Sequence, residues 1–344
     1  MLVEGAEGAL DFRYEQTRDL VYDSMTLARR RLLHRRAGAA LEARGHREEQ
    51  AAVIAHHLDL AGDEDGAARL YRVAGDRARA LYANAEALSH YRAALAHGSL
   101  DRAELYVAVG DLETLAGDYG AALASYETAA AEASAELGPV VEHRLGVLHL
   151  RRGEWELADA SLLAALRGSA GAAAARATAD RSLVAHRRGR SDEARELAAA
   201  ALELAELADD GRARAKARNI LGSLAASSGN NALAFMHLEA SLALAEEAGD
   251  VGAQAAALNN LALVAAAAGE RERATELTEA GIALTVTLGD RHREAALRNN
   301  LADLLHAAGQ RHEAMAELKK AVAAFAEVGE EGKLEPEIWK LSEW

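Results

Sequence analysis

Apolar and polar positions alternate with a helical period over most of this chain, most clearly in its last third. Three segments that begin at Asn219, Asn259 and Asn299 align without gaps, 40 residues apart. In each segment an apolar run with a 3.6-residue period ends at a glycine, and a second run rich in Ala and Leu follows. Glycine at such a point suits the left-handed backbone that ends a helix. The pattern predicts pairs of helices, each of roughly 17 residues.

A glycine followed five residues later by an alanine occurs seven times, and this series marks the repeat. From the second glycine onward the glycines are 36, 36, 40, 40 and 40 residues apart. A fixed spacing of this size is typical of stacked helix pairs that contact only their neighbours. We therefore predict a solenoid, a fold used mainly for binding. The pairs are Gly62/Ala67, Gly117/Ala122, Gly153/Ala158, Gly189/Ala194, Gly229/Ala234, Gly269/Ala274 and Gly309/Ala314.

Composition supports close-packed helices and narrows the function. The chain has two prolines, 4% aromatic residues and a formal net charge of −15. Because nucleic-acid phosphates attract clustered cations, direct nucleic-acid binding is not expected. The absence of cysteine excludes disulfides and thiolate metal sites. Residues 1–10 lack a signal-peptide pattern, and no apolar run approaches the ~20 residues that span a bilayer, so we expect a cytoplasmic protein without membrane contact.

Small and apolar residues recur in fixed columns around each turn glycine. Leu221 and Gly222 lie eight and seven residues before Gly229, and Ala234 and Ser241 lie five and twelve residues after it. This pattern resembles the tetratricopeptide repeat, in the longer form found in MalT-like bacterial regulators. The resemblance implies an all-α, right-handed α-solenoid. The next two repeats hold Leu261, Ala262, Ala274 and Gly281, then Leu301, Ala302, Ala314 and Ala321.

Two parts of the array depart from these columns. Between Gly62 and Gly117 lie 55 residues, too many for one repeat and too few for two. Residues 65–80 are therefore predicted to form a helix that two pairs share. In the repeat that turns at Gly189, the pair Arg181–Ser182 replaces the usual Leu–Gly, so the packing of this repeat is the hardest to predict.

The C-terminal segment continues the register for half a repeat. Trp339 follows Asn299 by forty residues, and the segment 331–344 is long enough for one helix. We predict a capping helix whose Trp339 and Trp344 cover the apolar end of the stack.

A separate pattern occupies residues 11–45, outside the repeat register. It resembles the end of the winged-helix segment that follows the nucleotide-binding domain in STAND-class signalling ATPases, including large LuxR-type bacterial regulators. Tyr14 stands where that family has a histidine, which argues against nucleotide sensing through this position. The resemblance implies a helical head over 1–46, an array of about eight repeats over 47–330, and the capping helix over 331–344. The matching residues are Phe12, Arg13, Glu15, Arg18, Asp19, Tyr22, Arg30, Arg31, Leu33, His34 and Arg35.

Motifs for ATP hydrolysis and DNA reading are missing from this sequence. It contains no G-x-x-x-x-G-K-[ST] loop and no helix-turn-helix reader after the array. We expect the sensor part of a larger regulator, with a stand-alone repeat scaffold as the alternative. An arginine cluster in the head lacks interleaved aromatic residues, so we expect it to contact an ATPase core and not to bind nucleic acid. The cluster is Arg29, Arg30, Arg31, Arg35 and Arg36.

The resemblance to tetratricopeptide arrays also implies a binding surface. There the first helix of each pair lines a concave groove, through positions ten, six, three and two residues before the turn glycine. Asparagines recur in this register and could bind an extended peptide backbone, since an amide both donates and accepts hydrogen bonds. A row of structural amides between helices is the alternative. The predicted contacts are Asn219, Ser223, Ser227, Asn259, Asn260, Leu263, Asn299, Asn300, Asp303 and His306.

The same register predicts a basic part of the groove nearer the N-terminus. It comprises Arg176, His186, Arg187 and Lys216, joined by His143 and Arg151. Such a patch in an acidic protein could attract a carboxylate or phosphate of a partner. A solvated helix face is the alternative.

No residue constellation in the sequence predicts catalysis. Carboxylates recur singly on polar faces, and no His, Ser and Asp fall together at equivalent positions. His56 and His57 are adjacent, so their side chains diverge on a helix, and no third metal ligand follows at a suitable spacing. We expect no enzyme, no cofactor and no metal, and we expect a peptide, protein or small effector as the partner.

Overall fold

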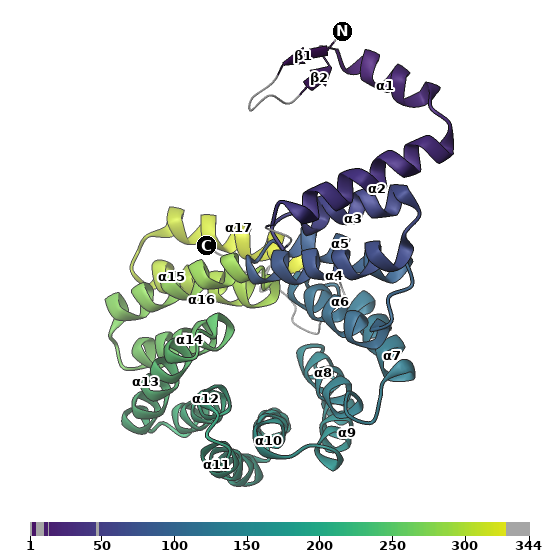
Figure 1. Ribbon diagram of the computed structural model, residues 1–344. Helices are drawn as coiled ribbons and strands as arrows, with labels where there is room; N and C mark the ends of the chain where they lie inside the picture. Colours follow the sequence, from purple (N-terminus) through teal and green to yellow (C-terminus); the bar gives the residue numbers. More distant parts are fainter. Residues whose placement is uncertain (1, 5–9, 13, 46–47, 328–344) are drawn as a thin grey trace. The chain divides into compact units, whose positions relative to one another are not determined.

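The computed structural model describes residues 2–4, 10–12, 14–45 and 48–327. The chain divides into two compact units, unit 1 (Met1–Arg102) and unit 2 (Ala103–Trp344). Helices make up nearly all of the regular structure in the described ranges (Figure 1). The predicted all-α repeat architecture is confirmed.

Among its described residues, unit 1 has five helices and one pair of short strands. The strands pair antiparallel, with Leu2 opposite Phe12, and were not part of the predicted helical head. The alternation of apolar and polar residues in the second segment, Leu-Asp-Phe, suits a strand better than a helix. Helix α4 packs against both α3 and α5. The elements are β1 (Leu2–Glu4), β2 (Leu10–Phe12), α1 (Glu15–Ser24), α2 (Leu27–Ala43), α3 (Ala51–Ala61), α4 (Glu64–Ala80) and α5 (Asn84–Ala96).

Unit 2 is a regular series of helix pairs. In Figure 1 the helices α8, α10, α12, α14 and α16 follow the inner side of its curve, and their partners α9, α11, α13, α15 and α17 follow the outer side. Successive inner helices contact each other from α8 to α14. The helices are α6 (Arg102–Ala116), α7 (Tyr119–Glu132), α8 (Gly138–Arg151), α9 (Trp155–Arg167), α10 (Gly171–Arg187), α11 (Ser191–Leu207), α12 (Gly211–Ser227), α13 (Asn231–Glu247), α14 (Val251–Ala267), α15 (Arg271–Leu288), α16 (Arg291–Ala307) and α17 (Arg311–Glu327).

The glycine–alanine series has the geometry that its spacing predicts. All seven turn glycines have a positive φ, between 72° at Gly153 and 84° at Gly117 and Gly269. All seven alanines are fully buried, at 0% exposure. Left-handed backbone at the turn is strained for residues with a side chain, and a larger residue than Ala would overpack the point where two helices meet.

The Leu–Gly column marks the closest approach inside each pair. A Cβ on Gly222 would lie 2.5 Å from Cγ of Leu238, so no side chain fits there. In the repeat with Arg181–Ser182, Ser182 is fully buried, and its hydroxyl donates a hydrogen bond to the carbonyl of Ala194 at 2.6 Å. Serine is thus accommodated because its hydroxyl has a partner.

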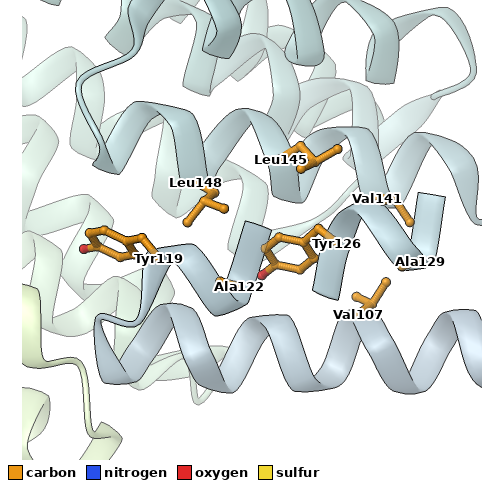
Figure 2. Close-up of a cluster of buried hydrophobic side chains, with 8 residues drawn as sticks. All are labelled: Val107, Tyr119, Ala122, Tyr126, Ala129, Val141, Leu145 and Leu148. Carbon is orange, nitrogen blue, oxygen red and sulfur yellow. The ribbon is translucent and has the colours of Figure 1, made fainter. Parts of the chain in front are cut away.

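Aromatic residues fill the start of unit 2, where small residues leave space. Tyr119 and Tyr126 of α7 are 1% exposed and pack between α6 and α8 (Figure 2). The hydroxyl of Tyr126 donates to Asp111 at 2.9 Å, which satisfies its polar end. The cluster consists of Val107, Tyr119, Ala122, Tyr126, Ala129, Val141, Leu145 and Leu148.

Several helices of unit 2 begin with a side-chain cap. Asp210, Asn230, Asp250 and Asp290 each accept a hydrogen bond from a backbone N–H in the first turn of the helix that follows. Such caps satisfy donors that have no partner within the helix.

Two further predictions bear on the limits of the fold. The predicted capping helix 331–344, with Trp339 and Trp344, lies outside the described residues. Across the part of the chain that the structure describes, no helix has the length and apolar character needed to cross a membrane.

Candidate functional site

The residues predicted to line the groove all lie on the inner helices of unit 2. Helix α10 carries Arg176, His186 and Arg187, and α12 carries Lys216, Asn219, Ser223 and Ser227. Helix α14 carries Asn259, Asn260 and Leu263, and α16 carries Asn299, Asn300, Asp303 and His306. Arg187, Ser227 and Leu263 are exposed, and the others are half-buried.

Four asparagines form a continuous chain of side-chain hydrogen bonds, which we name the amide chain. Asn300 Nδ2 donates to Asn259 Oδ1 at 3.1 Å, and Asn260 Nδ2 donates to Asn219 Oδ1 at 3.1 Å. Asn259 Nδ2 donates to Asn260 Oδ1 at 3.3 Å, which joins the two pairs. The amide chain therefore links α12, α14 and α16.

Both asparagine columns contribute to the amide chain. Asn219 and Asn259 belong to the column ten residues before the turn glycine, and Asn260 and Asn300 belong to the next one. The third residue of this second column, Ile220, is 5% exposed and packs in the core. The asparagines thus join neighbouring helices, and their partial exposure leaves them accessible from the inner face.

A buried carboxylate holds together the other half of the inner face. Asp180 of α10 is 5% exposed, and its Oδ2 accepts from His143 Nε2 of α8 at 2.8 Å and from Lys216 Nζ of α12 at 2.6 Å. Burial alone would raise the pKa of Asp180, but Lys216 and the hydrogen bond from His143 lower it to about 2. We name these three residues the Asp180 cluster.

Ion pairs occupy most of the cations that the basic patch was predicted to offer. Lys216 contacts Asp180, and Arg176 Nη1 lies 3.6 Å from Oδ2 of Asp210. Arg187 is exposed beside His186, whose pKa is lowered by burial and then by the Arg187 charge. Positive charge on this part of the inner face is therefore concentrated at Arg187.

Sequence reasoning did not identify Asp180 as the centre of the basic region. Its place in the repeat offered one signal, because it lies nine residues before Gly189, in the column that holds Asn260 and Asn300. A polar residue recurring in this column links neighbouring inner helices wherever it occurs.

The arginine cluster of the head lies on α2 in unit 1. Arg29, Arg31, Arg35 and Arg36 are exposed. Arg30 instead donates from Nη2 to the carbonyl of Asp23 at 2.8 Å, and its guanidinium lies 4.6 Å from the ring centre of Tyr22. Four of the five arginines are thus available at the surface of unit 1.

Histidines connect the helices at the start of unit 1. The hydroxyl of Tyr22 lies 2.9 Å from His34 Nε2, and His34 Nδ1 lies 2.9 Å from His57 Nδ1, so α1, α2 and α3 are joined. Within the described ranges, no group of three or more His, Cys, Asp or Glu side chains could hold a metal ion.

Comparisons with known proteins relate this chain to others through fold. No protein-family model matches it, and no curated protein matches it in sequence. A Rap conjugation gene regulator of plasmid pLS20, solved in complex with the Phr* peptide, is 15% identical with a TM-score of 0.61, and the match covers 81% of this chain and 79% of that one. A Rap protein complexed with competence and sporulation factor is 13% identical with a TM-score of 0.56, over 76% of this chain and 78% of that one.

A third similar structure is a signalling ATPase. The STAND protein with a tetratricopeptide repeat sensor from Pyrococcus horikoshii is 13% identical with a TM-score of 0.51, and the match covers 98% of this chain and 56% of that one. The fold of this chain is therefore a helical-repeat solenoid of the tetratricopeptide type.

Proposed function

We propose that unit 2 is a non-catalytic module that binds an extended peptide, free or as part of a protein, along the inner face at the amide chain. The amide chain is the observation that carries this proposal. It presents four half-buried asparagines on three successive inner helices, already oriented by hydrogen bonds to each other.

Side-chain amides in this arrangement keep capacity for a ligand. Each amide has two N–H donors and an oxygen that accepts two hydrogen bonds. Within the amide chain, Asn259, Asn260 and Asn300 each donate one hydrogen, and Asn219, Asn259 and Asn260 each accept one. The remaining donors and acceptors match those of an extended backbone, and mutual bonding holds the side chains in place before binding, which reduces the entropy lost on binding.

Electrostatics favour a ligand with a carboxylate near Arg187. The Asp180 cluster neutralises Lys216, so the exposed guanidinium of Arg187 forms the more positive end of the predicted groove. A peptide with its C-terminus or an acidic side chain at this end would gain a charge-assisted hydrogen bond. Ser223, Asn299, Asp303 and His306 then belong to the surface that the peptide backbone follows.

The comparisons support a peptide ligand and a regulatory setting. Two of the similar structures are Rap proteins solved with a peptide or a named factor, and the third is a STAND ATPase with a repeat sensor. We propose that this chain is likewise the sensor of a bacterial signalling or transcriptional regulator and that it acts in the cytoplasm. Its exposed Arg29, Arg31, Arg35 and Arg36 would contact an ATPase core, with Leu27 (64% exposed) adding apolar contact.

A stand-alone scaffold that joins protein partners is the second candidate, since the same inner face would serve it. Sequencing the surrounding reading frame separates the two. A P-loop domain encoded upstream in the same frame supports the regulator, and a frame without one supports the scaffold.

Affinity selection with a pooled library of random heptapeptides tests the peptide proposal. Peptides retained by the full chain are identified by mass spectrometry, labelled and titrated by fluorescence anisotropy. We expect Asn259→Ala/Asn260→Ala to weaken binding at least about tenfold, which corresponds to roughly 1.4 kcal/mol. The matched control Asn231→Ala, on outer helix α13, should leave affinity unchanged. Selection of no peptide, or full affinity in the double variant, would contradict the proposal.

A further inference from the structure

Unit 2 contains contacts between parts of the array that are far apart in sequence. In a helical-repeat array each repeat normally contacts only its neighbours. Here the guanidinium of Arg151, at the end of α8, donates two hydrogen bonds to Asp290, at the start of α16, at 3.0 and 2.8 Å. The hydroxyl of Tyr119, at the start of α7, shares a hydrogen bond with Nδ1 of His292, at 2.6 Å. We name these four residues the closing contact.

The closing contact is buried and specific. Tyr119 and Asp290 are each 1% exposed, and the Arg151 side chain is 18% exposed. Burial, followed by the nearby Arg151 charge, lowers the pKa of His292 to about 4, so the ring is neutral near pH 7. A bidentate pair between arginine and carboxylate in a buried setting fixes both distance and orientation.

The surroundings of Asp290 and His292 connect the start of α16 to two other helices, α14 and α17. The backbone N–H of Arg293 donates to Asp290 Oδ1 at 3.1 Å, and its guanidinium donates to the carbonyl of Gly252 in α14 at 3.0 Å. The ring of Phe325 in α17 packs edge-on against His292. Asp290 therefore caps α16 and also pairs with Arg151. The start of α16 is thus held by its own cap and by the ion pair with α8.

Together with the inner face, the closing contact completes a circuit of side-chain bonds. The Asp180 cluster links α8 to α10 and α10 to α12, and the amide chain links α12 to α14 and α14 to α16. The Arg151–Asp290 pair then links α16 back to α8. Because the circuit is closed, the spacing of the inner helices cannot change much unless one of its links breaks.

Among these links, the closing contact is the one that can break while neighbouring helices stay packed. The other links join inner helices that are successive in the array, and from α8 to α14 these helices also contact each other directly. Arg151 and Asp290 instead lie 139 residues apart in the chain. When separated, both ions become hydrated, which offsets the loss of their attraction, so closed and open arrangements can both be stable.

We propose that the closing contact is a latch: unit 2 exchanges between a closed state, in which α7–α8 and α16 are joined, and an open state in which they separate. The latch is a property of unit 2 alone and does not depend on what the inner face binds. Any ligand that contacts the inner face differently in the two states would shift the balance between them.

Pulsed electron paramagnetic resonance on spin-labelled protein tests the latch directly. The chain has no cysteine, so Leu157→Cys on α9 and Val286→Cys on α15 introduce the two labels at exposed positions without background. Arg151→Met removes the ion pair. The matched control is Arg181→Met, which removes the ion pair between Arg181 and Asp159 of neighbouring helices, where N and O lie 2.9 Å apart.

We expect mainly the closed-state distance in the labelled parent, a longer distance that gains population in Arg151→Met, and an unchanged distribution in Arg181→Met. A distribution in folded Arg151→Met that matches the parent would overturn the latch. If Arg151→Met does not fold by circular dichroism, Asp290→Asn, which keeps an amide cap on α16, decides in the same way. A longer distance in Arg181→Met as well would also contradict the proposal, because it would assign the change to a general loosening of the array.

Discussion

The two halves of the inner face join their helices by different chemistry. From α8 to α12 the link is one buried carboxylate with two cationic or hydrogen-bonding partners, and from α12 to α16 it is a series of neutral amides. The carboxylate is satisfied by the protein and has little exposure, whereas the amides keep unused donors and acceptors. We propose that the Asp180 half maintains the array and that the amide half binds the ligand.

Removing the central carboxylate should have the largest effect on stability. Asp180→Asn leaves Lys216 and His143 facing a neutral amide, and breaking a buried ion pair costs roughly 3 to 5 kcal/mol. We expect about 3 kcal/mol, because Lys216 can still reach solvent. Urea unfolding measures the change. The control Asp192→Asn removes an exposed pair with Arg195 and should change stability by less than about 1 kcal/mol, so equal effects in the two variants would contradict the assignment.

Acid should reduce the contribution of Asp180 to the free energy of unfolding over a defined range of pH. The folded protein holds the pKa of Asp180 near 2, below its ordinary value of 3.8, so its contribution is complete above pH 3.8 and is lost as pH falls toward 2. This difference corresponds to about 2 kcal/mol. The stability gap between the parent and Asp180→Asn should therefore shrink by that amount from pH 4 to pH 2. A gap that stays constant over this range would show that charge is not the cause.

His292 should add a separate pH dependence at higher pH. Its folded pKa of about 4 lies below the ordinary value of 6.5. Between pH 4 and pH 6.5, therefore, His292 is largely protonated in the unfolded chain and largely neutral in the folded chain. Stability from this residue is complete above pH 6.5 and is lost as pH falls toward 4, by an amount on the order of 3 kcal/mol at most. His292→Gln should reduce this slope in urea unfolding from pH 7 to pH 4. An unchanged slope of stability against pH in His292→Gln would contradict this role of His292.

Loss of a single amide should have the smallest effect on stability. Asn260→Ala removes two hydrogen bonds between half-buried side chains, and each such bond contributes about 1 kcal/mol. Because water can replace a partner at this exposed surface, we expect about 1 kcal/mol in total by urea unfolding. A loss as large as that of Asp180→Asn would remove the distinction between the two halves.

Periodic features of this molecule could be predicted from sequence, because each depends on contacts within a repeat. The turn at Gly229 and the buried Ala234 follow from spacing alone, and so does the placement of Asn219 and Asn259 on equivalent faces. Ser182 departs from its column, yet a hydrogen bond to Ala194 compensates, which a pattern of residue types does not indicate.

Features that depend on the curvature of the array could not be predicted in this way. Arg151 and Asp290 meet only because small rotations between successive repeats add up along α8 to α16. Asp290 has an evident local role as a helix cap, shared with Asp250, so nothing in its neighbourhood in sequence marks a distant partner. The charge state of the basic patch was missed for a related reason, since Lys216 is neutralised by a residue 36 positions earlier.

Peptide affinity measured in variants of the two halves tests the central claim most directly. A peptide selected from the heptapeptide library is titrated against Asn259→Ala/Asn260→Ala and against Asp180→Asn, at a temperature where circular dichroism shows both variants folded. We predict at least about a tenfold loss in the amide variant and no loss of affinity in Asp180→Asn, although Asp180→Asn is the less stable protein. Unchanged affinity in the amide variant together with a loss in Asp180→Asn would contradict the account.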